Sequence, residues 1–121
     1  MEQIELISTG GAYHSKTQTF ISGDSYGMLR RHNINCAFVS CIGLDRNRGP
    51  SEGFEQQAVF KEALIQTAQK VVLLVDSTKF NQASEYFFAS LRDITEIITD
   101  DGADPEFVED LRSQGCIVTI A

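Results

Sequence analysis

Two charged residues follow the most apolar stretch of this sequence. Asp76 and Lys79 come directly after residues 71–75, a run of valines and leucines typical of a buried parallel strand. Charge placed beside a buried strand is costly unless it binds a ligand or finds a partner. We therefore expect Asp76 and Lys79 to contribute to a binding site. The alternative is that Asp76 caps the following turn and that Lys79 extends into solvent.

A third charged residue, Lys61, stands within an apolar helix face. On the helix predicted over residues 54–69, a turn of about 100° per residue places five side chains on one side. They are Phe54, Ala58, Lys61, Ile65 and Ala68. Glu55 and Glu62 project to the opposite, polar face. The Lys61 ammonium must either run past its neighbours to solvent or enter a polar pocket, and we favour the pocket. Two lysines that converge on strand ends suit an anion such as phosphate.

Further candidates come from the loops that follow the predicted strands. In open α/β sheets, ligands bind beyond the carboxyl ends of the strands. This rule selects the loops after Ser40, after Val75 and after Thr99. Their remaining candidate ligand-binding residues are Gly43, Arg46, Arg48 and Asp100. The alternative for the two arginines is that they are simply solvated.

Several kinds of site are missing from the sequence. It contains no GxGxxG or GxxxxGK[ST] segment, which argues against a dinucleotide or P-loop nucleotide site. Neither histidine lies at a predicted strand end, so no Ser/His/Asp set is plausible. Cys36, Cys41 and Cys116 lack metal-ligand spacing, and their odd number favours reduced thiols. We expect no cofactor, no metal and no catalytic residue.

The elements that must position these residues alternate along the chain. Strands are predicted at residues 4–8, 36–40, 71–75, 96–99 and 117–120. Helices are predicted at residues 26–31, 54–69, 84–91 and 105–112, with residues 13–20 as an irregular edge segment and 45–53 as a loop. Ser22 or Asp24 would cap the first helix, while Asp104 and Gly115 bound the last one. Strands alternating with helices predict one α/β domain, residues 1–121, with a mainly parallel sheet flanked by helices.

Composition narrows the class of protein. The 121 residues have a net charge of −7, and 42% of them are hydrophobic. This balance is ordinary for a packed globular domain and lacks the basic surface of an autonomous nucleic-acid binder. No apolar run reaches the length of a membrane span, and the acidic N-terminus is unlike a signal peptide. We therefore expect a cytoplasmic protein.

Several sequence segments in combination resemble those of a known family. The segments are Leu6-Ile7-Ser8-Thr9-Gly10-Gly11, Gly43 with Gly49, Ala58-x-x-Lys61-x-x-Leu64-Ile65-x-x-Ala68, Leu74-Val75-Asp76-Ser77-Thr78-Lys79-Phe80, Ile97-Ile98-Thr99-Asp100 and Leu111-x-x-x-Gly115-x-x-Val118. Together they are similar to the effector-sensing domain of DeoR-type repressors of sugar metabolism. The resemblance spans essentially the whole chain.

The resemblance implies a function that composition and spacing do not show. Members of this family typically carry an N-terminal winged helix-turn-helix that binds operator DNA. Their C-terminal domain resembles ribose-5-phosphate isomerase in fold and senses a phosphorylated sugar or related metabolite. Asp76 and Lys79 match the family's strand-end pair, and Lys61 matches its helix lysine. We therefore expect a metabolite-sensing domain of a bacterial regulator, a homo-oligomer that reaches DNA only through a separate N-terminal domain.

The chain also departs from the family pattern. The helix-turn-helix, the first strand-helix unit with its Gly-Thr-Thr-like phosphate loop, and the loop with a Thr-Asn pair are not in this sequence, which predicts an N-terminally truncated domain. Asn35 stands where an aspartate is common, and Ser40 where a glycine is common. In the isomerases a carboxylate on the equivalent helix abstracts a proton, and that position holds Lys61 here. Binding without turnover is therefore favoured. The alternatives are a small sugar-phosphate isomerase and a truncated domain that only oligomerises.

Overall fold

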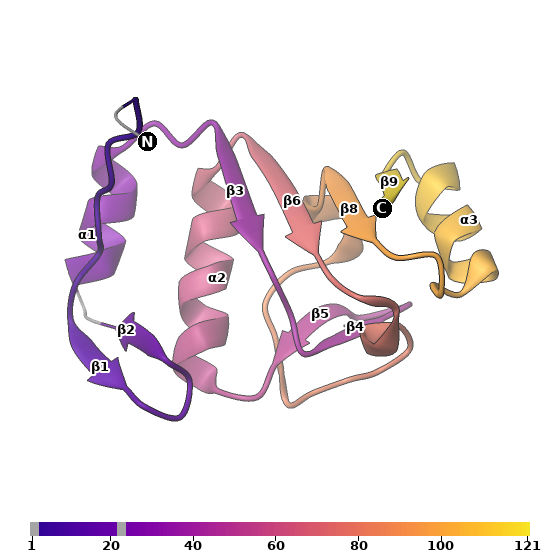
Figure 1. The fold of residues 1–121 in the computed structure, drawn as a ribbon, viewed down its shortest axis with the longest axis horizontal. Helices are drawn as coiled ribbons and strands as arrows, with labels where there is room; N and C mark the ends of the chain where they lie inside the picture. Colours follow the sequence, from indigo (N-terminus) through magenta and orange to yellow (C-terminus); the bar gives the residue numbers. More distant parts are fainter. Residues whose placement is uncertain (1–2, 22–23) are drawn as a thin grey trace.

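The computed structural model describes residues 3–21 and 24–121 and is built around a parallel sheet. Four strands lie in the order β3–β6–β8–β9 (Figure 1). They are β3 (Cys36–Val39), β6 (Lys70–Leu74), β8 (Glu96–Thr99) and β9 (Ile117–Ile120). The helices are α1 (Asp24–Arg31), α2 (Glu55–Thr67) and α3 (Pro105–Ser113). The predicted α/β class with a parallel sheet and flanking helices is confirmed.

The core lies on one face of this sheet. Val39, Leu73, Ile97 and Val118 stand opposite one another in register, and each is at most 7% exposed. Helix α2 covers them with Ala58 and Ile65, and α3 with Phe107, Val108 and Leu111. Side chains alternate between the two faces of each strand, so every second one points to the helices and contributes to the core. Helix α1 packs on α2, where the rings of Tyr26 and Phe60 lie 6.2 Å apart.

The outer face of the sheet is largely exposed. Phe38, Val72 and Ile117 belong to one register row on this face, and Leu74 lies two residues beyond Val72. Phe38 is 64% exposed, Ile117 54% and Leu74 44%, whereas Val72 is 3% exposed. The prediction that residues 71–75 form a buried strand is therefore correct for Val72 and wrong for Leu74.

A second, antiparallel sheet replaces two predicted irregular or helical segments. It consists of β4 (Gly43–Asp45), β5 (Gly49–Glu52) and β7 (Tyr86–Phe87), in that order. The predicted loop at residues 45–53 is a hairpin, whose turn is closed by the Asp45 carboxylate accepting from the backbone N–H groups of Asn47 and Arg48. The predicted helix at residues 84–91 is wrong. β7 pairs with β5, and Phe88 is buried at 2% exposed. These tertiary contacts outweigh the helical pattern of residues 84–91. A short 3₁₀ turn, η2 (Leu91–Asp93), follows.

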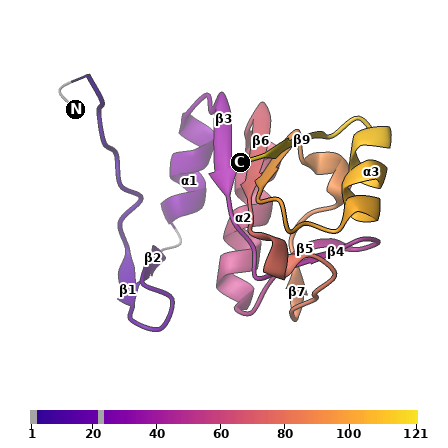
Figure 2. The ribbon, with the colours of Figure 1, turned by 45° about the vertical axis from the view of Figure 1, so that its right-hand side comes forward.

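The N-terminal region differs most from the prediction. Residues 4–8 are exposed and form no strand, and this segment stands away from the sheet (Figure 2). The expected irregular segment at residues 13–20 is a hairpin of β1 (Ala12–His14) and β2 (Thr19–Ile21). Of the two candidate caps of the first helix, Ser22 lies outside the described residues, and Asp24 is the first residue of α1.

The ends of α3 follow the sequence signals. Asp104 caps the helix by accepting from the backbone N–H of Glu106 at 3.0 Å, and Pro105 is the first helical residue. Gly115 ends the segment with a φ of +92°, a conformation that glycine adopts readily. None of the helices in the described part of the chain is long and apolar enough to cross a membrane.

Candidate functional site

The three loops selected from the sequence meet at one edge of the sheet. β3, β6 and β8 are neighbours and run parallel, so the segments after Ser40, Val75 and Thr99 emerge side by side. The second and third segments are joined directly. The Asp100 carboxylate accepts from the backbone N–H of Ser77 at 2.5 Å and from its hydroxyl at 2.9 Å. The prediction that these three loops lie at the same edge of the sheet is therefore correct. The contacts described next show what each of their side chains does.

Asp76 shapes the turn that carries Lys79. Its carboxylate accepts from the backbone N–H of Thr78 at 2.9 Å and from the Thr78 hydroxyl, capping the 3₁₀ turn η1 (Ser77–Lys79). These hydrogen bonds from Thr78 hold the pKa of Asp76 below its ordinary value. The capping alternative is therefore correct for Asp76. Lys79 is half-buried rather than extended into solvent, and it makes no salt bridge with any residue that the structure describes.

The Asp100 carboxylate fixes the position of the η1 turn. Its hydrogen bonds from the backbone and hydroxyl of Ser77 lower the pKa of the Asp100 carboxyl. Gly102 allows the close approach, because a Cβ there would lie 2.7 Å from the Ser77 hydroxyl oxygen. The carboxylate is thus engaged within the protein, and its contacts connect the loop after β8 to the turn that holds Lys79.

Lys61 lies on the buried side of α2, as its helix position predicts, and finds a partner that the sequence analysis missed. Its ammonium donates to the Glu52 carboxylate and, at 2.7 Å, to the backbone carbonyl of Ser40. The side chains are 14% exposed for Lys61 and 8% for Glu52. The Lys61 ammonium therefore has polar surroundings instead of running to solvent, formed by the last residue of β5 and the residue after β3. The Phe88 ring lies beneath, with its centroid 5.4 Å from the Lys61 nitrogen.

Cys41 lies among these charges. Burial raises the pKa of its thiol to about 12, although the nearby ammonium groups of Lys61 and Lys79 act in the opposite direction. The thiol therefore stays protonated and is a poor nucleophile. Lys61 contacts Ser40 and Glu52, and the segment after Lys79 packs on Leu44, so these residues gather where β3 ends and the β4–β5 hairpin begins. The described residues contain no group of three side chains suited to hold a metal ion.

Gly43 supports the site without contributing a side chain. A Cβ at this position would lie 2.7 Å from the backbone carbonyl oxygen of Gln82. The backbone N–H of Asn81 donates to the Leu44 carbonyl at 2.8 Å, and Leu44 bridges to Phe80. Gly43 therefore lets the segment that follows Lys79 pack directly on the base of the hairpin.

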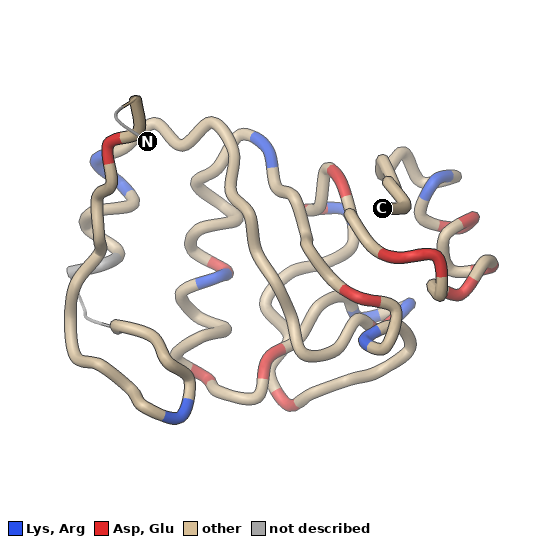
Figure 3. The backbone as a smooth tube through the Cα atoms, in the orientation of Figure 1, with Lys and Arg blue, Asp and Glu red and all other residues tan. Residues whose placement is uncertain are grey.

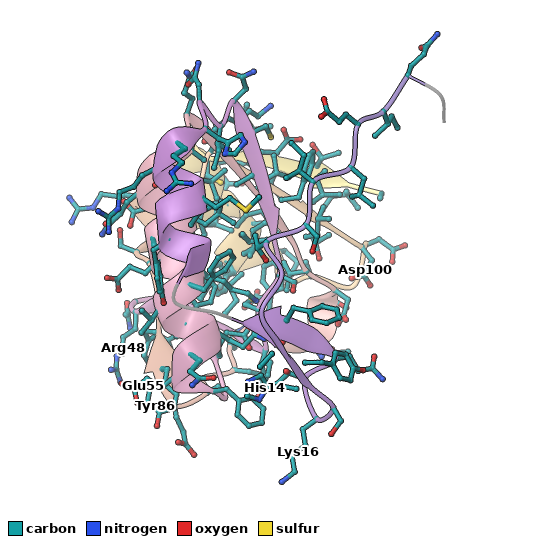
Figure 4. The ribbon with its side chains drawn as sticks, turned by 90° about the vertical axis from the view of Figure 1, so that its left-hand side faces the viewer. His14, Lys16, Arg48, Glu55, Tyr86 and Asp100 are labelled. Carbon is teal, nitrogen blue, oxygen red and sulfur yellow. The ribbon has the colours of Figure 1, made fainter. Side chains whose placement is uncertain are left out.

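The structure does not bring Arg46 and Arg48 to the strand ends. They lie at the tip of the β4–β5 hairpin, which extends away from Ser40. The Arg46 guanidinium pairs with Asp110, donating from Nε at 2.7 Å, in the acidic α3 region (Figure 3). Arg48 stacks on Phe87, 4.0 Å from the ring centroid, and lies far from Asp100 (Figure 4). A cavity of about 560 Å³ at this tip is lined by Arg46, Asn47, Ser90, Leu91, Arg92 and Gln114.

Comparison with known proteins agrees with the resemblance seen in the sequence. The family model for the DeoR C terminal sensor domain matches residues 1–101. The uncharacterized HTH-type transcriptional regulator YulB of Bacillus subtilis (strain 168) is 35% identical over 98% of this chain and 46% of its own length. A putative aga operon transcriptional repressor of Escherichia coli O157:H7 is 28% identical, over 98% of this chain and 44% of its own length.

An L-fucose operon activator of Escherichia coli (strain K12) is 30% identical over 83% of this chain and 41% of its own length. The chain thus spans somewhat under half the length of these three relatives. The relatives are transcriptional regulators, not enzymes, and two of them are named for an operon, the aga operon and the L-fucose operon. Together with the family match over most of its length, this shows that the chain belongs to the family of DeoR C-terminal sensor domains.

Proposed function

We propose that this sensor domain binds a phosphorylated sugar, without converting it, at the carboxyl ends of β3 and β6. In this proposal Lys79 binds the anionic group of the ligand. The observation that supports this role is that Lys79 is a half-buried residue without a salt bridge to any described residue, on a turn fixed by Asp76 and Asp100. Because the backbone of this turn is already fixed, less conformational freedom is lost when an anion binds, which favours binding.

The charge balance of the site supports the same assignment. Lys61 is already neutralised by Glu52, so its pair has no net charge. Lys79, in contrast, has no carboxylate within salt-bridge distance among the described residues, although the Asp76 carboxylate lies near enough to interact with it electrostatically. Sugar phosphates combine one anionic group with several hydroxyl groups, and the relatives named for the L-fucose operon make them the first class to test. Contact with operator DNA belongs to a separate domain in this proposal, and the cytoplasm, where such phosphates occur, is the proposed location.

Thermal unfolding with added ligand tests the proposal. Ribose 5-phosphate and fructose 6-phosphate are the probes, with ribose and fructose as uncharged controls. A ligand at a hundred times its Kd stabilises the folded chain by about 2.7 kcal/mol, which corresponds to several degrees of Tm. We expect at least one phosphate to give this shift and to remain chemically unchanged.

The variant Lys79→Met should abolish the shift, because it removes the charge and keeps most of the apolar stem. Lys16→Met is the matched control, since Lys16 is an exposed lysine on the β1–β2 hairpin (Figure 4). The proposal is wrong if neither phosphate raises the Tm, or if Lys79→Met responds like the wild type.

A further inference from the structure

We infer that Glu52 and Lys61 together bind a hydroxyl group of the sugar, and that Glu52 thereby sets the preference for a sugar phosphate over a simple anion. This inference rests on the proposed function and divides the ligand between two parts of the site. Lys79 takes the anionic group, and the Glu52–Lys61 pair takes the polyhydroxyl part.

The hydrogen-bonding capacity of Lys61 is not used up within the described structure. An ammonium group has three hydrogens to donate. The Ser40 carbonyl oxygen, 2.7 Å away, accepts one, and Glu52 Oε1 accepts another. The third has no acceptor among the described residues. Because the Ser40 carbonyl and Glu52 together fix the nitrogen, the direction of the remaining donor is fixed as well.

Glu52 has a matching unused acceptor. Its Oε1 is bound to Lys61, while its Oε2 accepts no hydrogen bond from any described residue. Among the described residues, no side-chain nitrogen or oxygen is both fully buried and without a hydrogen-bond partner. Oε2 must therefore reach solvent, even though the Glu52 side chain is only 8% exposed. A carboxylate buried on one side and open at one oxygen is well placed to receive a donor from outside.

An unused donor next to an unused acceptor suits a hydroxyl group. A hydroxyl donates one hydrogen bond and accepts others, so one sugar hydroxyl can donate to Oε2 and accept from the Lys61 ammonium. An inorganic phosphate ion keeps a P–OH group near neutral pH but is a poor substitute, because its own negative charge would lie against the Glu52 carboxylate. Charge-assisted hydrogen bonds of this kind are stronger than neutral ones. The pair therefore favours ligands that carry a hydroxyl beside their anionic group.

The test compares sugar phosphates with inorganic phosphate on the variant Glu52→Gln. Glutamine retains an oxygen for Lys61 and can place an NH₂ group where Oε2 stood, so an acceptor becomes a donor. Affinities of the folded chain for ribose 5-phosphate, fructose 6-phosphate and inorganic phosphate are measured by calorimetric titration. We expect Glu52→Gln to weaken binding of the sugar phosphates at least tenfold and not to weaken binding of inorganic phosphate, because the variant also removes a repelling charge. Lys79→Met should weaken all three.

Three outcomes would overturn the inference. If wild type binds the sugar phosphates and Glu52→Gln binds them equally well, Glu52 does not bind a sugar hydroxyl, while the proposed function stands. If the variant weakens all three probes equally, Glu52 supports the site as a whole. If no probe binds to wild type, the proposed function fails and this inference with it. Should Glu52→Gln fail to fold, Glu52→Asp replaces it, because it keeps the charge beside Lys61 and withdraws Oε2 by one methylene.

Discussion

Two cation–carboxylate pairs of this protein have the same chemistry and different surroundings. Lys61 and Arg46 were both candidate anion-binding residues, and both meet a carboxylate in the structure. The Lys61–Glu52 side chains are 14% and 8% exposed, whereas those of Arg46 and Asp110 are 38% and 45% exposed. The first pair ties α2 to β5 and to the end of β3, and the second joins a hairpin tip to the surface of α3.

The comparison shows that the burial of a lysine or arginine side chain indicates its role better than the residue type does. Water and salt screen an exposed pair, so its contribution to stability is small. A buried pair is stable only while both partners are present, since removing one leaves a desolvated charge. Burial also fixes the geometry of the remaining donor and acceptor atoms. A binding function is therefore easier to build on the Lys61–Glu52 pair than on the Arg46–Asp110 pair.

The largest expected effect comes from breaking the buried pair. Lys61→Met should lower the free energy of unfolding by about 3–5 kcal/mol, because it leaves the Glu52 carboxylate buried without its cation. The double variant Lys61→Met with Glu52→Gln should recover a substantial part of this loss. Urea unfolding followed by circular dichroism measures both. If Lys61→Met lowers the free energy of unfolding by less than about 1 kcal/mol, the Lys61–Glu52 pair behaves like an exposed salt bridge and the prediction is wrong.

An intermediate effect is expected from Asp100, a carboxylate held by neutral donors instead of a cation. Hydrogen bonds from Ser77 lower its pKa from the ordinary value of 3.8, so folding favours its charged form. Its contribution to stability is therefore complete well above pH 3.8 and is lost as the pH falls through the lowered pKa. Unfolding free energies measured between pH 6 and pH 2.5 should decline less steeply for Asp100→Asn than for the wild type.

The residue Asp93 offers a comparison for this measurement. It caps η2 through Ser90, away from the strand ends. At pH 6, Asp100→Asn should lower the free energy of unfolding by less than Lys61→Met does. It should also reduce the rise in Tm caused by ribose 5-phosphate, because the turn that carries Lys79 loses its hydrogen bonds to Asp100. Asp93→Asn should leave that response unchanged. Identical pH profiles for Asp100→Asn and the wild type would contradict this role of Asp100.

The smallest effect is expected at the exposed pair. Arg46→Met should change the Tm by only about 1 °C, because the guanidinium and its partners are accessible to water. The ribose 5-phosphate response should be unchanged, since Arg46 lies at the hairpin tip. Arg92→Met is a matched arginine control at the same cavity. Loss of the ligand response in Arg46→Met would show that the tip contributes to binding and would reverse the contrast between the two pairs.

Local signals in the sequence predicted part of this site. The apolar stripe of α2 placed Lys61 on the buried side, and the apolar run before Asp76 located the strand end from which η1 begins. The last helix was bounded correctly, since Asp104 and Gly115 act through contacts within a few residues. These features depend on neighbours along the chain, which are the contacts that a sequence pattern encodes.

Other features depended on contacts that the pattern does not contain. Glu52 was missed because it meets Lys61 only after β5 has paired with β4 and β7 and α2 has folded back over the hairpin. Its burial is a tertiary effect, and a lone glutamate after a serine carries no signal of it. Likewise, Tyr86 and Phe87 form a strand because β5 offers them a partner, which outweighs their helical spacing.

The outer face of the parallel sheet has a consequence for handling the protein. Phe38, Leu74 and Ile117 present apolar surface to water, and parallel sheets are normally covered on both sides. Such surface adheres to other apolar surface, and the attraction strengthens on warming and in sulfate or phosphate buffers. Concentrated samples will therefore be colloidally most stable in cool solutions free of these salts, a choice that also keeps competing anions away from the proposed ligand site.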